Sequence, residues 1–279
     1  MKRKLKMTSI IDRNPTNNEV EKLRLILSTY QDGSGQQSDK KGKSLPGWRD
    51  FERSVAFTFG GQAQESKFIF DVLIPDTSRP RVYAGISCKM RRTLDETTKT
   101  GRVTLELSNS SGKFWKELEL LGINQQNYKN VPERVGNVLL SLIAKWHREV
   151  SLEKGGSVDI HKSFYLALSW DKRGNYQLFK FSLEIRAAEK LEWDFPIIID
   201  KNGEAKVGRR LRGMDETGTI LEWYGESGAQ LKYYPLVRDA IWISSPFQLE
   251  ELPENWMVRH GIEVKAKDYF HDLWTKATT

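Results

Sequence analysis

Apolar side chains at helical spacing predict two helices near the start of the chain. The first is expected over residues 17–30, with Asn17 or Asn18 available as its cap. Its apolar stripe consists of Val20, Leu23, Leu27 and Tyr30. The second is expected over residues 48–59, directly after Pro46 and Gly47. Its stripe consists of Trp48, Phe51, Val55 and Phe59, with Glu52 beside it.

Two short apolar runs follow, and each carries one functional group. The run 67–75 is interrupted by a single carboxylate, Asp71, and the run 82–91 carries Lys89 near its end. The linker between them is too short for a helical crossover, so the runs are expected to form an antiparallel hairpin. Alternate residues of a strand share a face. Ser87 is therefore expected to point the same way as Lys89, with Cys88 pointing into the core.

The rest of the chain changes from helical to strand-like patterns. Residues 91–102 are polar, residues 103–121 are interpreted as the approach to a helix and its body, and residues 132–150 as a long helix. Short strands are expected at 163–170, 176–185, 195–199, 205–207, 220–224, 231–235 and 240–243, and a last helix at 267–274. The pattern indicates an α/β (α+β) fold, in which a mixed sheet is flanked by helices and followed by a β-rich C-terminal elaboration.

Composition narrows the classes of partner and metal. The 279 residues carry a net charge of +7, which favours a polyanionic partner without requiring one. The single cysteine excludes an intramolecular disulfide, and the four scattered histidines disfavour a histidine-ligated metal. Any cation is expected to be hard and oxygen-ligated, such as Mg²⁺. No apolar run approaches a membrane span, so a cytoplasmic protein without membrane contact is expected.

The carboxylate and the lysine on adjacent strands are the candidate chemistry. A carboxylate inside an apolar run is costly unless it binds a cation or a partner. Asp71 and Lys89 could form a cross-strand ion pair with a purely structural role. They could also form a metal-dependent phosphodiesterase site, in which the acid holds a divalent cation and the lysine adds positive charge.

Over about residues 17–150, the array resembles the PD-(D/E)XK nuclease superfamily, the fold of most type II restriction endonucleases. Asp71 matches the metal-binding Asp, Lys89 the Lys, and Glu52 the acid on the preceding helix. The chain departs at the middle acid, where it has Ser87. Some similar restriction enzymes also carry Ser there and take the missing carboxylate from the helix after the lysine strand, for which Glu106 is the matching candidate.

Other acids near the motif are weaker candidates. Asp95 and Glu96 lie closer in sequence but are expected in a polar loop, and Asp76 is expected in the turn after Pro75. The resemblance implies one nuclease domain over residues 1–279, with a catalytic core half at 17–150. The β-rich half at 151–279 would complete the core and contribute to DNA recognition.

The resemblance also implies a mechanism, in-line hydrolysis of a DNA phosphodiester. Asp71 and Glu106 would hold one or two Mg²⁺ ions, and Glu52 would bind a second cation or a water on it. Lys89 would orient or deprotonate the attacking water and stabilise the developing charge. Ser87 would hydrogen-bond a water at the cation, or would be an ordinary polar strand residue.

Basic residues supply the candidate DNA contacts. The segment 207–216 can read base edges through Arg or Asp, although a solvated loop with local ion pairs explains it equally well. Arg91 and Arg92, directly after the lysine strand, and lysines in the Gly-rich loop are candidate phosphate contacts. The principal candidates are Lys41, Lys43, Arg91, Arg92, Lys113, Arg209, Arg210, Arg212 and Asp215.

The expected function is Mg²⁺-dependent, sequence-specific cleavage of double-stranded DNA by a type II endonuclease of a restriction-modification system. By analogy with enzymes that cut palindromes, a homodimer is expected. Two alternatives stay open. One is a DNA repair or mobile-element nuclease of the same fold, and the other a DNA-binding protein with a degenerate, inactive core. The absence of a GxxxxGK[ST] motif favours the first interpretation over an ATP-driven enzyme.

Overall fold

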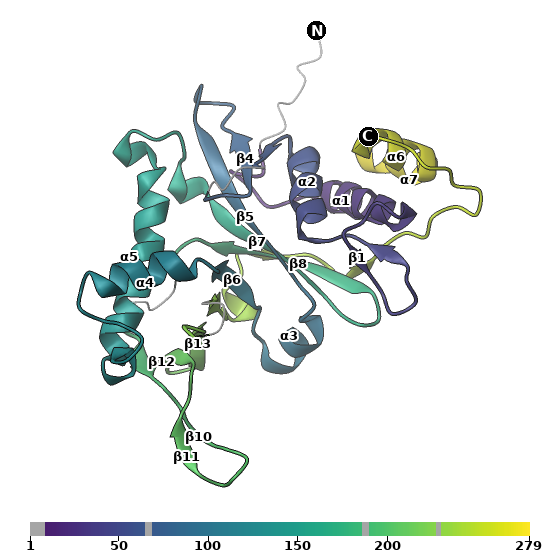
Figure 1. The fold of residues 1–279 in the computed structure, drawn as a ribbon. Helices are drawn as coiled ribbons and strands as arrows, with labels where there is room; N and C mark the ends of the chain where they lie inside the picture. Colours follow the sequence, from purple (N-terminus) through teal and green to yellow (C-terminus); the bar gives the residue numbers. More distant parts are fainter. Residues whose placement is uncertain (1–8, 65–68, 186–189, 227–229) are drawn as a thin grey trace. The chain divides into compact units, whose positions relative to one another are not determined.

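A computed structural model describes residues 9–64, 69–185, 190–226 and 230–279 (Figure 1). It confirms the mixed α/β fold class, with a mixed sheet flanked by helices. The chain forms two compact units. Unit 1 comprises residues 1–95, 150–183 and 240–279, and unit 2 comprises residues 96–149 and 184–239. The division therefore does not follow the expected halves at 17–150 and 151–279, because both units draw on both halves of the sequence.

Unit 1 is built around a mixed sheet. Its helices and strands are α1 (Asn17–Thr29), η1 (Tyr30–Asp32), β1 (Gln37–Ser38), β2 (Ser44–Leu45), α2 (Trp48–Phe59), β3 (Gln62–Ala63), β4 (Val72–Pro75), β5 (Tyr83–Arg91), η3 (Leu152–Lys154), η4 (Ile160–Lys162), β7 (Phe164–Trp170), β8 (Asn175–Ser182), β15 (Trp242–Ile243), β16 (Phe247–Gln248), α6 (Ile262–Tyr269) and α7 (His271–Thr278). The sheet runs in the order β15-β8-β7-β5-β4-β3, and β16 also pairs with β8.

The expected hairpin is part of this sheet, and β5 is one of its central strands. Strands β4 and β5 are antiparallel, with Val72 opposite Ile86. On its other side β5 pairs in parallel with β7, from Ile86 opposite Phe164 to Arg91 opposite Ser169. The first strand is shorter than the expected run 67–75, of which Lys67 and Phe68 lie outside the described residues.

Two helices cover one face of the sheet through the stripes that the sequence predicts. Leu23 and Leu27 of α1 join Phe51 and Val55 of α2 in one core with Ile86 and other strand residues. The cap of α1 is Thr16, one residue before the expected asparagines, because its hydroxyl accepts from the Glu19 N–H while the Glu19 carboxylate accepts from the Thr16 N–H.

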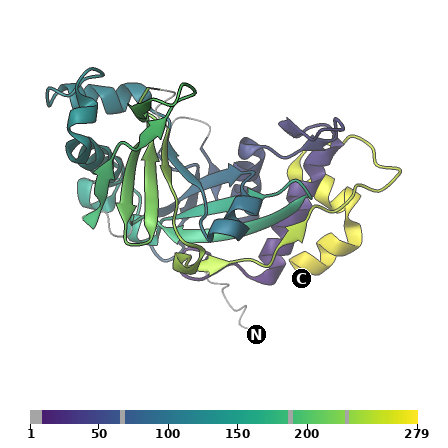
Figure 2. The ribbon, with the colours of Figure 1, turned by 90° about the horizontal axis from the view of Figure 1, so that it is seen from below.

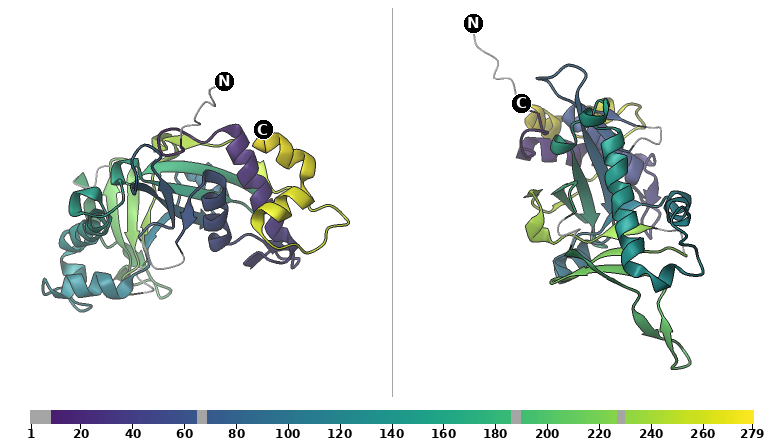
Figure 3. Two further views of the ribbon diagram at one scale, coloured as in Figure 1. Left: turned by 90° about the horizontal axis from the view of Figure 1, so that it is seen from above. Right: turned by 90° about the vertical axis from the view of Figure 1, so that its left-hand side faces the viewer.

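A second apolar cluster lies on the opposite side of α1. Its members are Leu25, Ile26, Tyr30, Ala266, Tyr269, Phe270, Trp274 and Ala277. Figure 3 shows α6 and α7 beside α1. The sequence predicts one helix at 267–274, whereas the structure has two, which divide at Phe270.

Unit 2 contains an antiparallel sheet in the order β6-β14-β13-β12-β9, whose strands lie side by side in Figure 2. Its elements are β6 (Leu105–Ser108), α4 (Ser111–Glu119), η2 (Tyr128–Asn130), α5 (Pro132–Glu149), β9 (Glu192–Asp194), β10 (Ile197–Ile199), β11 (Ala205–Val207), β12 (Leu211–Asp215), β13 (Gly218–Trp223), β14 (Leu231–Tyr233) and η6 (Val237–Asp239). The long helix α5, expected at 132–150, packs against β9 and β12, and β10 pairs with β11 as a separate hairpin.

The helix expected at 103–121 is wrong in its first part. Residues Leu105–Ser108 form strand β6, and the helix α4 begins only at Ser111. The run 103–108 alternates apolar with polar residues, with Val103 and Leu105 fully buried, which is the period of a strand. The polar loop expected at 91–102 contains a short helix, α3 (Leu94–Thr100), anchored by the buried Leu94.

Within the described residues, no helix is both long enough and apolar enough to cross a membrane.

Candidate active site

Asp71 lies directly before β4 and is held by the main chain of β5. Its backbone N–H donates to the Ile86 carbonyl at 3.0 Å, so the residue continues the ladder of the hairpin. Its Oδ2 then accepts from the backbone N–H of Cys88 at 2.7 Å and lies 3.4 Å from the Ser87 hydroxyl. The carboxylate thus replaces a backbone acceptor at the point where β4 begins, and two bonds from β5 fix its orientation.

Lys89 lies next to this carboxylate, as the sequence predicts. Its Nζ is 3.9 Å from Oδ2 of Asp71, and the two side chains are 18% and 28% exposed. Cys88, between Ser87 and Lys89, is buried in the core shared by the sheet, α1 and α2. As expected from strand alternation, Ser87 and Lys89 lie on the side of Asp71, and the Cys88 side chain points into the core.

Glu52 brings a second carboxylate from α2. Phe51 and Val55 pack α2 on the sheet, so the adjacent Glu52 lies half-buried at the edge of this contact. Burial raises the pKa of Glu52 to about 7, and the negative charge of Asp71 adds to this, while Lys89 opposes it. Two acids that repel each other in a partly buried place favour a cation between or beside them.

The residues present fit a hard divalent cation. Mg²⁺ is commonly held by one or two carboxylates and keeps several waters, so Asp71 with Glu52 suffices as a protein ligand set. The carbonyl of Cys88 is a further candidate oxygen, because the N–H and C=O of one strand residue point to the same side. In the part of the chain that the structure describes, no three His, Cys, Asp or Glu side chains gather into a metal cluster.

The third predicted carboxylate belongs to unit 2. Glu106 lies on strand β6, opposite Lys232 of β14, and not on the helix from which the resemblance implies it should come. Asp71, Lys89, Glu52 and Ser87 all belong to unit 1. The structure therefore brings four of the five predicted catalytic residues together, and leaves the role of Glu106 a prediction.

The weaker acidic candidates have other partners. Asp76 is buried and accepts from the hydroxyl and backbone N–H of Ser78, which lowers its pKa, with further bonds from Arg79 and Lys162. It stabilises the hairpin turn. Asp95 lies 3.7 Å from Arg173, and Asp95 and Glu96 lie on α3 instead of in the expected loop.

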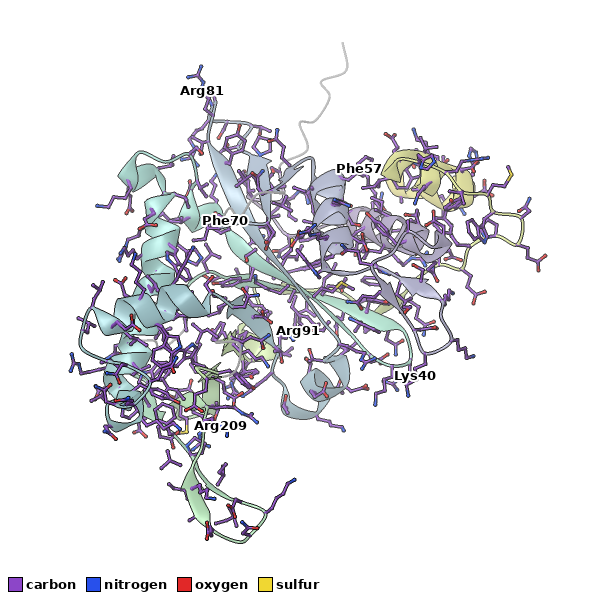
Figure 4. All side chains as sticks on the ribbon, viewed as in Figure 1. Lys40, Phe57, Phe70, Arg81, Arg91 and Arg209 are labelled. Carbon is purple, nitrogen blue, oxygen red and sulfur yellow. The ribbon has the colours of Figure 1, made fainter. Side chains whose placement is uncertain are left out.

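The predicted DNA contacts of unit 1 lie at the end of β5 and in the β1–β2 hairpin. Arg91 is the last residue of β5, at the opposite end of the strand from Arg81 (Figure 4). The exposed Arg92 places its guanidinium over the Trp170 ring, 5.5 Å from the centroid. Lys41 and Lys43 are exposed, and their backbone N–H groups donate to Asp39.

The predicted contacts of unit 2 are largely engaged in ion pairs. Arg212 of β12 donates two hydrogen bonds to Asp194, at 2.9 and 2.6 Å, as a forked pair across the strands. Arg210 lies 3.5 Å from Glu222 and Arg209 3.6 Å from Glu226. Asp215 accepts from Thr217, and Lys113 lies over the Trp146 ring. The local ion pairs that were the alternative interpretation of segment 207–216 are thus present.

Sequence reasoning missed a group of residues on the exposed side of α2. Arg49 and Arg53 are exposed, and both lower the pKa of Glu52 through their positive charge. Trp48 is 52% exposed, and the Arg49 guanidinium lies 4.8 Å from its ring centroid. The sequence spacing could have shown this group. Residues four positions apart are neighbours on a helix surface, so Trp48 lies next to Glu52 and Arg49 next to Arg53.

No family model matches the chain, and neither a curated protein nor a solved structure shows significant similarity to it.

Proposed function

We propose that the chain is a Mg²⁺-dependent endodeoxyribonuclease of the type II restriction class, which hydrolyses phosphodiesters of double-stranded DNA at a specific sequence. The observation that carries the proposal is the approach of Lys89 Nζ to within 3.9 Å of Asp71 Oδ2, with Glu52 beside them. A structural ion pair would explain Asp71 and Lys89, but it would not require a second, mutually repelling carboxylate at the same place.

Asp71 and Glu52 would hold the cation, whose chemistry is to stabilise negative charge on the attacked phosphate. The Asp71 carboxylate is presented by the Cys88 N–H, so its direction is set before substrate binds. Lys89 places a positive charge next to it, where it can hydrogen-bond the attacking water and stabilise charge that develops in the transition state. The buried Ser87, also on β5, donates a second hydrogen bond to the Asp71 carboxylate through its hydroxyl.

Double-stranded DNA is the proposed substrate, and its proposed contacts include Arg91 and Arg92 after β5. Cleavage of both strands of a palindrome would be explained by a homodimer, whose symmetry matches that of the site. The net charge of +7 supports a polyanionic substrate.

Incubation of the purified protein with plasmid DNA and Mg²⁺ tests the proposal. Discrete fragments that disappear with EDTA and with Asp71→Asn are expected. Nicking or structure-dependent cutting would instead indicate a repair or mobile-element nuclease. Binding of DNA without any cleavage, unchanged by Asp71→Asn, would contradict the enzymatic assignment.

A further inference from the structure

We infer that the exposed side of α2 is a binding site for the phosphates of the cleaved DNA strand, formed by Arg49 and Arg53 with Trp48 as their aromatic support. This inference rests on the proposed nuclease function and adds a substrate-binding element to it. The motif used only Glu52 of this helix, and the basic segments considered in the sequence lie elsewhere.

The first argument is position along the helix. Arg49 and Arg53 are four residues apart, so their side chains neighbour each other on the surface of α2. Glu52 precedes Arg53 directly and lies one turn after Trp48. The opposite side of the helix carries Phe51 and Val55, which are fully buried against the sheet. The two guanidinium groups therefore extend from the same helix that presents the second carboxylate of the candidate active site.

The second argument is electrostatic. Arg49 stands three residues before Glu52 on α2 and Arg53 directly after it, so the positive charges of both arginines lie beside the second carboxylate of the candidate active site. A phosphate bound near Asp71 and Glu52 would enter the field of two guanidinium groups. Arginine is suited to this contact because its planar fork matches two phosphate oxygens.

The acid nearest to Arg49 along the chain is already engaged elsewhere. Asp50 is buried, and its Oδ2 accepts from the backbone N–H groups of Gly47 at 2.8 Å and Gln36 at 2.9 Å. It closes the start of α2 and ties the preceding loop to it. The local sequence Arg49-Asp50 therefore does not form a neutralising pair on the surface.

The third argument is the exposure of Trp48. Trp48 is 52% exposed, so its ring is accessible at the surface of α2. Here the Arg49 guanidinium lies 4.8 Å from the ring centroid. Stacking on an aromatic face restricts the guanidinium to one plane while its N–H groups stay available at the edge. Trp48 is thus a positioning residue for Arg49.

Salt-dependent binding measures this site directly, because each phosphate contact contributes about 0.9 to the slope of log K against log salt concentration. The probe is a fluorescein-labelled duplex of arbitrary sequence, measured by fluorescence anisotropy with Ca²⁺ in place of Mg²⁺ over about 50 to 200 mM NaCl. Arg49→Gln and Arg53→Gln are each expected to weaken binding and to lower the slope by about 0.9, and the double variant by roughly 1.8.

Arg81→Gln is the matched control. Arg81 is exposed and lies at the tip of the β4–β5 hairpin, away from the end that carries Arg91 (Figure 4). Its substitution by Gln removes the same charge as the other two substitutions. It is expected to leave the slope unchanged. Trp48→Ala is expected to weaken binding, and Trp48→Phe, which keeps an aromatic face, to restore most of it. Thermal unfolding of each variant shows that the fold is retained.

The outcomes separate this inference from the proposed function. If the wild-type protein cuts plasmid DNA while Arg49→Gln and Arg53→Gln behave as Arg81→Gln, the α2 site is wrong and the nuclease stands. If the slopes fall as expected but no cleavage occurs, the phosphate site stands without the chemistry. If the wild-type protein neither binds duplex nor cuts it, both are overturned.

Discussion

The backbone N–H of Cys88 donates a 2.7 Å hydrogen bond to Oδ2 of Asp71, so the main chain of the lysine strand orients the acid of the neighbouring strand. The bond does not involve the Cys88 side chain, which is buried on the other face. Two consecutive residues therefore act on the Asp71 carboxylate. The Cys88 N–H fixes its orientation, and the Lys89 ammonium group places a positive charge beside it.

Asp71→Asn tests the charge of this carboxylate while keeping its shape. The amide oxygen can still accept the Cys88 N–H, so stability is expected to change by no more than about 1 kcal/mol. Plasmid cleavage in Mg²⁺ is expected to fall roughly 100-fold or more, because the negative charge that would hold the cation is gone. Cys88→Ala is the matched control, since it keeps the backbone bond and should retain cleavage.

Lys89→Met tests the ammonium group separately from the acid. It is expected to lower the cleavage rate by about 100-fold or more while duplex binding in Ca²⁺ is largely retained. Because Lys89 lowers the pKa of Glu52, its loss should also shift the residual pH–rate profile to higher pH. If Lys89→Met cleaves DNA at the wild-type rate, the Asp71–Lys89 pair has only a structural role.

Glu52 makes stability depend on pH in a direction that can be checked. Its pKa in the folded protein is about 7, against an ordinary value of 4.5. Below pH 4.5 the group is protonated in both states and has no effect. Between these two pKa values the unfolded chain loses the proton first, so the free energy of unfolding falls as pH rises, and above pH 7 the deficit is constant.

Glu52→Gln should therefore be more stable than the wild type at pH 8, by about 1 kcal/mol, with the difference vanishing near pH 4. This difference in the free energy of unfolding is smaller than the full pKa shift would give, because the Glu52 side chain is partly exposed and its charge is screened by solvent. Thermal unfolding across this pH range, without divalent cations, measures it. Added Mg²⁺ should stabilise the wild type more than Glu52→Gln, and equal stabilisation would contradict a cation at Glu52.

Glu106→Gln decides whether a third carboxylate takes part. If Glu106 is a cation ligand, the variant should need a higher Mg²⁺ concentration and cut roughly 100-fold more slowly. Glu96→Gln, an exposed acid on α3, is the control and should behave as the wild type. A Glu106→Gln protein with wild-type cleavage would assign Glu106 to pairing between β6 and β14 only.

Local patterns predicted the centre of the candidate site, because its parts are close in sequence. The bounds of α2 and nearly all of β5 follow from their apolar stripes, and a linker too short for a crossover forces Asp71 and Lys89 onto adjacent strands. The placement of Glu106 failed because Val103 and Leu105 suit a buried strand, whereas the resemblance suggested a helix.

Other features depend on contacts that no local pattern contains. The parallel pairing of β5 with β7 joins segments separated by the first part of unit 2, and the two-unit division follows from it. The forked bond between Arg212 and Asp194 likewise requires β12 to lie beside β9. A list of arginines in the sequence cannot distinguish such a bonded residue from one that meets a phosphate.

The partnership of β5 with β7 also sets an order of events during synthesis. The hairpin bearing Asp71 and Lys89 leaves the ribosome well before residues 164–170, which must add along the far side of β5. Until then β5 has a bare edge, and pairing across such a sequence separation is slow. A nascent chain that stalls before residue 164 would carry both functional groups without the strand that completes the pairing of β5.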